Sequence, residues 1–353
     1  AKTTPYDVIL FGKSTDSTGF GGASFSSDVL DSDDDMKNLG AVQVHDPFLK
    51  RVIADAIQAL IELVKERGWA IGFKDLGAGG ISCATSELGV GAGLGVRLNL
   101  DDVNVAVDGL APEVIACSET QERFCLVVPK EASAEILRLF NETFSLPELY
   151  YKAGAVVIGE VTQESRFVIT HQDTVVCDLP IEAITTDVHA DRKADLNRFV
   201  AKESEVPTLT LDQLKQQCEL QLAMHNNTSK RYVYRYYDNA VRGHTVIYPG
   251  EADSVVITPV EGCQTGVAVS MDSNLYGNVD PYVSGASAVA ESVRNVIAVG
   301  AVPLAISDCL NYGSPEHPSV FYDFQEGVRG IGEAARALSL HNENIPIISG
   351  NVS

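Results

Sequence analysis

A glycine-rich turn with a single acid, inside FKDLGAGGISCATSELGVG at residues 73–91, constrains this chain more than any other stretch. Asp75 stands beside three glycines, between a predicted buried strand at 69–73 and a predicted helix from Ile81. Glycine lets the backbone approach a ligand closely, and a helix start presents free N–H groups suited to phosphate. Mg²⁺ prefers one or two carboxylates together with phosphate oxygens. Asp75 is therefore a candidate Mg²⁺ ligand, and the alternative is a tight turn with a solvated capping Asp.

Composition narrows the class of protein. The 353 residues have a net charge of −22, which argues against binding to a nucleic-acid backbone. The length allows two or three domains, and a hydrophobic content of 45% is typical of a globular protein. Seven scattered cysteines without a C-x-x-C pair indicate reduced thiols and a cytoplasmic location. We find no signal peptide and no apolar run long enough to cross a membrane.

The first half of the chain reads as alternating strands and helices. An apolar strand at 8–11 leads into a second glycine-rich loop at 12–25, which lacks the Walker A spacing and has a flexible surface loop as its alternative. Asp46 followed by proline opens the clearest helix, which Gly68 ends. Just before it, Gln43 alternates with two valines, so its amide faces away from them.

A polar cluster at 118–121 precedes a predicted strand at 124–128, where it either lines a cleft or forms an ordinary loop. A helix at 131–140 follows. Short strands then close a domain near Ile184, at 155–160, 167–170 and 174–179.

The second half begins with a polar linker at 187–207 and a helix at 211–224. The basic and aromatic run at 230–237 predicts an amphipathic strand or an extended arm rather than a nucleic-acid surface. From residue 243 a second domain is expected. It would have hairpin strands at 254–258 and 265–271, helices at 281–299 and 321–340, and further strands at 303–307 and 345–348. Asp308 and Asn311 follow the strand at 303–307, where α/β proteins place ligands, and residues 349–353 form a small-residue turn.

Taken in order, these tracts resemble the phosphoribosylformylglycinamidine synthases of purine biosynthesis, in their single-function ligase subunit. The resemblance covers nearly the whole chain, because one tract after another matches in the family's order. The matching tracts are the glycine loop, VQVHDPF, DLGAGG, SETQER, KRYVYRYYD, DPYVSGA, SDCLNYGSP and SGNVS.

The resemblance implies an α+β, PurM-like architecture. A C-terminal-type mixed α/β domain would occupy residues 1–186, and a linker with a helix and an aromatic, basic arm would occupy 187–242. An N-terminal-type, ferredoxin-like domain, incomplete here, would occupy 243–353. By the same resemblance, the chain is an internal fragment of a longer enzyme.

The resemblance also implies site residues. The contacts to formylglycinamide ribonucleotide would be Gln43, Glu119, Thr120, Gln121 and Ser353. The family usually has Ser at position 120, so that hydroxyl is only partly preserved in kind. Asp308 and Gly350 would contact ATP, and Asp75 and Asn351 would bind Mg²⁺. Ser17, Thr18 and Gly21 replace residues that are often charged or His in the family, which argues against a charged role for that loop.

The implied activity is ATP-dependent C–N ligation, in which ATP activates an oxygen of the substrate and ammonia displaces it. The implied partners are a glutaminase subunit that supplies the ammonia and a small bridging subunit, with no nucleic acid and no membrane. None of the seven histidines lies in the family's catalytic motif, which falls upstream of Ala1. We therefore expect the isolated chain to catalyse no ligation and to self-associate. The alternative is a non-catalytic binding or scaffold fragment of the same fold.

Overall fold

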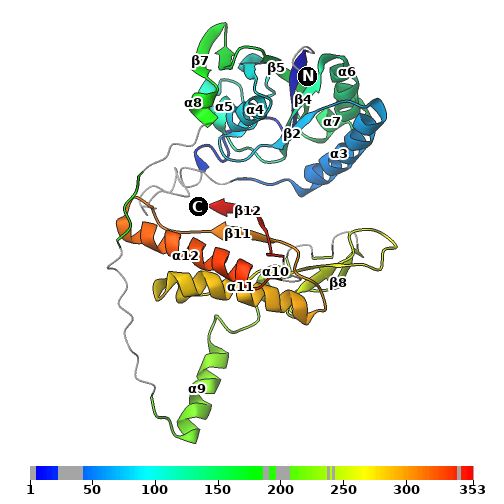
Figure 1. The fold of residues 1–353 in the computed structure, drawn as a ribbon. Coiled ribbons are helices and arrows are strands. Elements are labelled where there is room, and N and C mark those ends of the chain that lie inside the picture. Colours follow the sequence, from blue (N-terminus) through cyan, green and yellow to red (C-terminus); the bar gives the residue numbers. More distant parts are fainter. Residues whose placement is uncertain are drawn as a thin grey trace. The chain divides into compact units, whose positions relative to one another are not determined.

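The computed structural model describes residues 5–22, 43–185, 191–195, 207–236, 239–240, 243–339 and 343–352. Two compact units, Ala1–Ala190 and Asp191–Ser353, make up the chain, and each is considered by itself (Figure 1). Of the predicted site residues, Ser353 alone lies outside the described residues. The finer boundaries at 186/187 and 242/243 stay predictions.

The first unit is built on a seven-stranded mixed sheet of order β2-β4-β1-β5-β3-β6-β7. All neighbouring strands pair antiparallel except β3 and β6, which are parallel. The strands are β1 (Tyr6–Gly12), β2 (Gly72–Asp75), β3 (Gly95–Asn99), β4 (Arg123–Pro129), β5 (Gly154–Thr162), β6 (Arg166–His171) and β7 (Thr174–Pro180). The strands predicted from the apolar runs at 8–11, 124–128, 155–160, 167–170 and 174–179 are confirmed.

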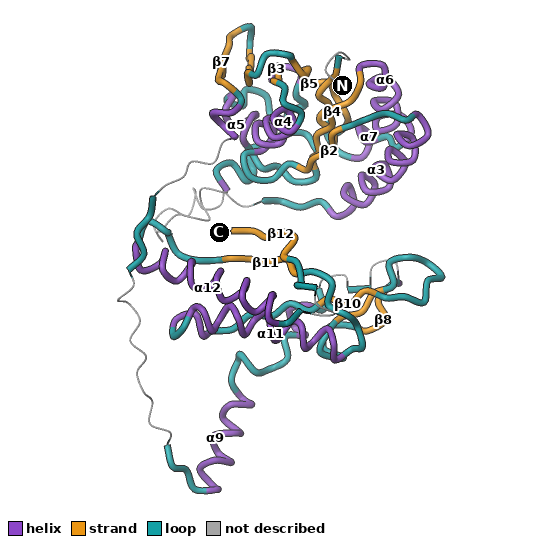
Figure 2. Tube along the Cα trace, viewed as in Figure 1, coloured by secondary structure: helices purple, strands orange, loops and turns teal. Residues whose placement is uncertain are grey.

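Helices cover both faces of this sheet (Figures 1 and 2). Side chains of the interior strand β1 alternate between two cores: Val8 and Leu10 point to one, and Ile9 and Phe11 point to the other. On the first face lie α4 (Gly80–Gly91), α5 (Pro112–Cys117) and α8 (Glu182–Thr185). On the second lie α3 (Pro47–Arg67), α6 (Lys130–Arg138) and α7 (Leu146–Leu149).

Helix α3 has the ends that its sequence predicted. Asp46 caps it by accepting a hydrogen bond from the Leu49 backbone N–H at 2.9 Å, and Gly68 closes it with a left-handed φ of 67°. The helical spacing of its apolar residues predicts a buried stripe that begins at Phe48 and includes Ile53, Ala56 and Leu60. This stripe is wrong at its first position, because Phe48 is 66% exposed and Leu49 is buried instead. The side of the helix that faces the sheet is therefore as predicted, apart from this first position.

Strand β2 corrects the expectation of a buried strand at 69–73. It begins three residues later, at Gly72, and forms the edge of the sheet, paired only with β4. An edge strand keeps one side in contact with solvent, so Phe73 is 44% exposed. Asp75 is consequently the last residue of an edge strand, and the glycine turn follows it.

The second unit contains a three-stranded antiparallel sheet and a separate pair of parallel strands beside two long helices (Figure 1). The sheet comprises β8 (Thr245–Ile247), β9 (Val255–Ile257) and β10 (Val267–Val269), and the helices are α11 (Pro281–Ala298) and α12 (Pro318–Ala337). Gly330 lets the two helices approach closely, because a β-carbon at this position would lie only 2.1 Å from the Tyr282 carbonyl oxygen. The predicted hairpin strands and both long helices are confirmed.

The parallel strands β11 (Ile306–Leu310) and β12 (Ile347–Val352) overturn two local predictions. The first strand starts three residues later than predicted, so Asp308 lies within it rather than beyond its end. The second runs through residues 349–352, which were predicted as a turn. Small residues are accommodated in this strand because it pairs backbone to backbone with β11, which propensity alone does not reveal.

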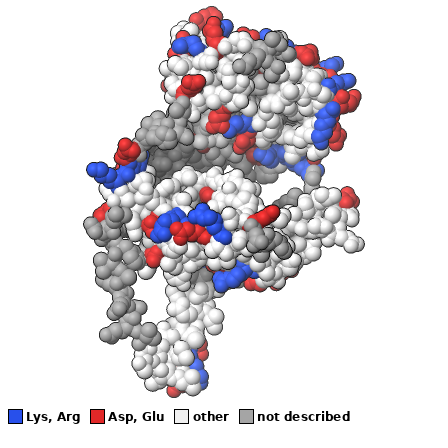
Figure 3. Space-filling view, viewed as in Figure 1, with Lys and Arg blue, Asp and Glu red and all other residues white. Residues whose placement is uncertain are grey.

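The first part of the second unit holds α9 (Leu211–Ala223), with a complete capping box at Thr210, and α10 (Arg231–Tyr234). The strand or arm predicted for 230–237 is wrong where the structure describes it, since its first half is helical. No helix among the described residues is both long and apolar enough to traverse a lipid bilayer. On the visible face, Lys and Arg side chains lie interspersed with Asp and Glu (Figure 3).

Candidate functional site

Three segments that are far apart in the sequence meet in the first unit: the glycine loop after β1, the residue Gln43, and the turn at 118–121 before β4. Gly19 of the loop adopts a left-handed φ of 69°. A β-carbon there would lie 2.9 Å from the β-carbon of Glu119 and 3.1 Å from the γ-carbon of Gln43. The glycine is therefore required for the three segments to come this close.

Two amide side chains bond to one residue of this cluster. Gln43 Nε2 donates to Glu119 Oε2 at 2.8 Å, and Gln121 Nε2 donates to the Glu119 backbone oxygen at 3.3 Å. Gln43 and Gln121, which are 78 positions apart in the sequence, thus both bond to Glu119. Their contact with a substrate stays a prediction. Gln43 is exposed and Gln121 is half-buried.

Thr120 lies between Glu119 and Gln121 in the turn. Its side chain is fully buried, and its hydroxyl donates to Asp16 Oδ1 at 2.9 Å and accepts from the Asp16 backbone N–H at 3.1 Å. Sequence reasoning missed Asp16, because the glycine loop was read as lacking a charged role. The loop does carry buried charge, since Lys13 is only 6% exposed and lies 3.4 Å from Asp16 Oδ2.

Arg123 completes the support of the turn. Its fully buried guanidinium donates to the backbone oxygens of Ser118 and Thr120, at 2.6 and 3.0 Å, and to the Thr15 hydroxyl at 2.8 Å. Burial lowers the pKa of Arg123 to about 10, so the group stays charged at neutral pH. The position of this arginine at the end of SETQER was the one sequence signal that could have identified it.

Asp75 and the turn that follows it lie at the start of α4. The first residues of this turn and helix, Gly79 and Gly80, both have left-handed φ, at 73° and 53°. Gly79 is the N-cap and has no side-chain capping bond. Asp75 therefore does not cap α4, and its exposed carboxylate forms no hydrogen bond or ion pair with another described residue. Its role as a Mg²⁺ ligand stays a prediction.

In the second unit, β11 and β12 bring the predicted nucleotide residues together. Asp308 pairs with Gly350, and the neighbouring Cys309 pairs with Asn351. The Asp308 carboxylate lies directly over Gly350, with Oδ1 1.8 Å from where a β-carbon on that glycine would stand. Sequence placed these residues 42 positions apart on separate turns, and the strand pairing makes them neighbours.

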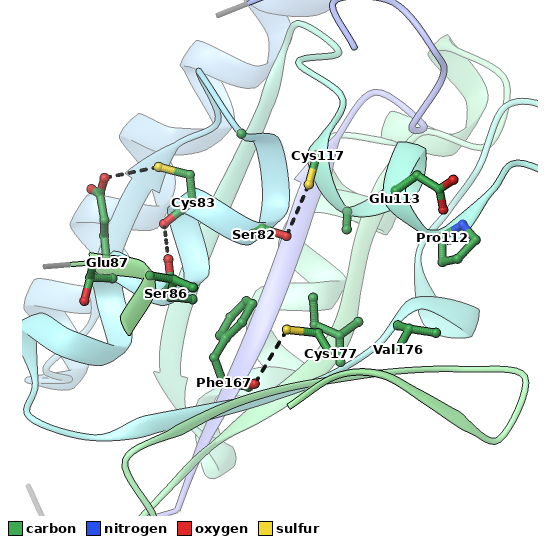
Figure 4. A pocket seen from close by; sticks show the side chains of 15 residues that line it. Ser82, Cys83, Ser86, Glu87, Pro112, Glu113, Cys117, Phe167, Val176 and Cys177 are labelled. Carbon is green, nitrogen blue, oxygen red and sulfur yellow. Dashed lines mark hydrogen bonds between the residues drawn. The ribbon is translucent and has the colours of Figure 1, made fainter. Parts of the chain in front are cut away.

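A hollow of about 560 Å³ lies on the α4 and α5 face of the first unit, apart from the predicted site residues (Figure 4). The cysteines Cys83, Cys117 and Cys177 line it from three separate segments. Burial is the first cause that raises the pKa of Cys83, to about 11, and it also raises that of Cys177. Both thiols therefore stay protonated and weakly nucleophilic at neutral pH. Within the described ranges, no three His, Cys, Asp or Glu residues are arranged to hold a metal ion.

Comparison with known proteins identifies the class. The family model of AIR synthase related protein, C-terminal domain, matches residues 5–172, and that of AIR synthase related protein, N-terminal domain, matches residues 251–353. The chain belongs to this family, with the C-terminal type of domain preceding the N-terminal type. The PurM-like fold class expected from the sequence is confirmed.

Within the family, the chain groups with the PurL subunit of phosphoribosylformylglycinamidine synthase. It is 45% identical to that of Methanothrix thermoacetophila and 37% identical to that of Methanothermobacter marburgensis, each over 99% of this chain. It covers 45% and 46% of those proteins, and so spans about half the length of the curated relatives it matches.

Solved structures agree with this grouping. T. maritima PurL complexed with FGAR superposes with a TM-score of 0.75 at 27% identity, covering 100% of this chain and 52% of that chain. T. maritima PurL complexed with ATP gives a TM-score of 0.71 at 25% identity, covering 100% and 50%.

Proposed function

We propose that this protein takes part in the ATP-dependent conversion of formylglycinamide ribonucleotide (FGAR) to formylglycinamidine ribonucleotide, with ammonia derived from glutamine, in purine biosynthesis. The observation that carries the proposal is the meeting of Gln43 and Gln121 on Glu119, formed by tracts that match the PurL relatives. In this reaction ATP activates the amide oxygen of FGAR, and ammonia replaces that oxygen to give the amidine, with ADP and phosphate released.

FGAR is neutral at its amide, and its ribose carries hydroxyls. Gln43 and Gln121 offer uncharged donors and acceptors, and Glu119 offers an acceptor, which together suit such groups. We therefore propose these three residues as the contacts in the first unit. The geometry supports this assignment because the bonds to Glu119 hold both amides in place before a substrate arrives. Ser353 stays a predicted contact.

ATP is the proposed ligand of the second unit, through Asp308 and Gly350. The strand pairing supports this, since the bare backbone at Gly350 gives the Asp308 carboxylate its position on the face of the strand pair. Solved PurL structures complexed with ATP, ADP and AMPPCP, each 25% identical to this chain, support nucleotide binding by this protein as well.

We propose Asp75, in the first unit, and Asn351, in the second, as ligands for Mg²⁺. Their oxygens fit a hard cation, and the Asp75 carboxylate is exposed without a competing ion pair among the described residues. The absence of a three-residue cage in the described ranges suits Mg²⁺ bound partly by phosphate oxygens. Bound Mg²⁺ would supply charge neutralisation at the transferred phosphoryl group.

The proposed partners are a glutaminase subunit, which releases ammonia, and a small bridging subunit. A solved assembly of Thermotoga maritima named PurLQS, whose PurL-like chain is 25% identical over 100% of this chain, supports a multi-subunit arrangement. We propose a cytoplasmic location, in which all seven cysteines stay as thiols.

The experiment uses the protein that carries this chain, supplied with FGAR, ATP, Mg²⁺ and an ammonium salt. We expect ADP release that depends on FGAR and a product one mass unit lighter than FGAR, since NH replaces O. ADP release without FGAR, or binding of both ligands with no turnover, would favour the scaffold alternative. Repeating the assay with glutamine and a glutaminase subunit tests the ammonia source.

A further inference from the structure

Thr120 has no free face for a ligand. Its side chain is fully buried, and its hydroxyl uses its proton on Asp16 Oδ1 and accepts from the Asp16 N–H. Ser118 Oγ lies 3.4 Å from the same hydroxyl oxygen. A substrate atom would have to displace Asp16 to reach this hydroxyl, so burial and bonding both argue against direct contact.

Asp16 is itself held from several directions. Besides Thr120, its Oδ1 accepts from the Thr18 N–H at 2.9 Å and from the Thr18 hydroxyl, and its Oδ2 faces Lys13. Burial would raise the pKa of Asp16, but the hydrogen bonds from Thr18 and Thr120 and the charge of Lys13 outweigh it and lower the pKa. Asp16 therefore presents a carboxylate to Thr120 throughout the neutral range.

The turn that Thr120 occupies carries the amide cluster on its two neighbours. Glu119 precedes Thr120, and Gln121 follows it. Arg123 Nε donates a hydrogen bond of 3.0 Å to the Thr120 backbone oxygen. A shift of Thr120 would therefore move both Glu119 and Gln121 relative to Gln43.

We propose that Asp16 and Thr120 form a latch between the glycine loop and the 118–121 turn, and that Thr120 positions Glu119 and Gln121 without touching the substrate. This inference rests on the proposed function, because it concerns the FGAR site. The latch also gives the glycine loop a charged role, in which Asp16 acts through the turn.

The test measures kcat and the KM values for FGAR and ATP. Thr120→Val removes the hydroxyl and keeps the shape, while Thr120→Ser keeps the hydroxyl and should stay within about twofold of the unmodified protein. Losing a hydrogen bond to a charged partner should raise the KM for FGAR by about tenfold in Thr120→Val, with the KM for ATP nearly unchanged. Asp16→Asn should act in the same direction.

Two further variants separate positioning from contact and from general destabilisation. In a protein that already carries Glu119→Ala and Gln121→Ala, Thr120→Val should raise the KM for FGAR less than about twofold, because the two residues that Thr120 positions are already gone. The matched control is Thr85→Val, which removes another fully buried threonine hydroxyl, bonded to the Ile81 oxygen at 2.7 Å within α4. This control should leave both KM values unchanged.

An additive effect of Thr120→Val in the protein that carries Glu119→Ala and Gln121→Ala would overturn the inference in favour of direct contact. A parallel rise in both KM values, or no change in either, would also overturn it. If the unmodified protein shows no FGAR-dependent turnover, the proposed function fails by itself. The latch is then judged by urea unfolding, in which Asp16→Asn and Thr120→Val must shift the midpoint non-additively.

Discussion

The carboxylate of Asp308 fills the space in which a side chain on residue 350 would begin. Its Oδ1 lies 1.8 Å from the position of a β-carbon on Gly350, and the two residues are paired across the parallel strands β11 and β12. No other residue type fits at 350 unless Asp308 moves. The two residues proposed to contact ATP are thus tied to each other by geometry.

Gly350→Ala should therefore weaken ATP binding. The new methyl group must displace the Asp308 carboxylate, and we expect the Kd for ATP to rise about tenfold or more, comparable to the loss of one charge-assisted hydrogen bond. Isothermal titration with ATP and Mg²⁺ measures this. Gly332→Ala, in α12, is the matched control, because its β-carbon would meet nothing closer than the Arg336 guanidinium at 3.6 Å. Unchanged ATP affinity in Gly350→Ala would show that Asp308 has no part in the nucleotide site.

Asp75→Asn distinguishes the two interpretations of the glycine turn. Gly79 caps α4 without a side-chain bond, so the substitution should change the free energy of unfolding by less than about 0.5 kcal/mol. It should nevertheless raise the Mg²⁺ concentration needed for half-maximal ligand binding, because an amide is a poorer ligand for Mg²⁺ than a carboxylate. A Mg²⁺ titration and chemical unfolding test both points. Lost stability of about 1 kcal/mol, with unchanged Mg²⁺ dependence, would restore the capping interpretation.

Gln43→Ala and Gln121→Ala should each raise the KM for FGAR by about tenfold, since each removes one neutral hydrogen-bonding group of the site. The KM for ATP should change little, which steady-state kinetics with each substrate varied can establish. Gln58→Ala is a suitable control, because Gln58 is a glutamine of the same unit whose long 3.5 Å bond to Glu62 lies on the exposed side of α3. The assignment fails if the control and the two site variants behave alike.

The cysteines should differ in their reaction with iodoacetamide. Burial raises the pKa of Cys83 to about 11 and that of Cys125 to about 12, whereas Cys218, Cys263 and Cys309 are exposed. Because the thiolate is the reactive form, labelling of Cys83 at pH 8 should lag behind the exposed three and rise roughly tenfold per pH unit until the pH reaches the pKa. Peptide mass spectrometry after timed labelling tests this order. Early labelling of Cys83 at pH 8 would contradict the buried environment.

The sequence by itself determined the elements whose signals are local. Asp46 and Gly68 cap helix α3 at its two ends as predicted, because a capping carboxylate and a left-handed glycine act on their own neighbours. Strands with long apolar runs, such as β4 and β5, were predicted for the same reason. The ordered tracts also carried the family, since many short matches in one order are specific where each one alone is not.

Tertiary structure alone decided the relations between distant segments. The place of β2 at the edge of the sheet, which exposes Phe73, depends on strands far away in the chain. The pairing of Gly350 with Asp308 depends on such distant partners as well. Asp16 was missed because a short polar loop has no periodicity that predicts burial, and its carboxylate gains its role only where Thr120 meets it. The sequence determined which residues the site could use, because residue chemistry is local. The structure decided which of them touch, because strand register and loop packing bring together residues that are far apart in the chain.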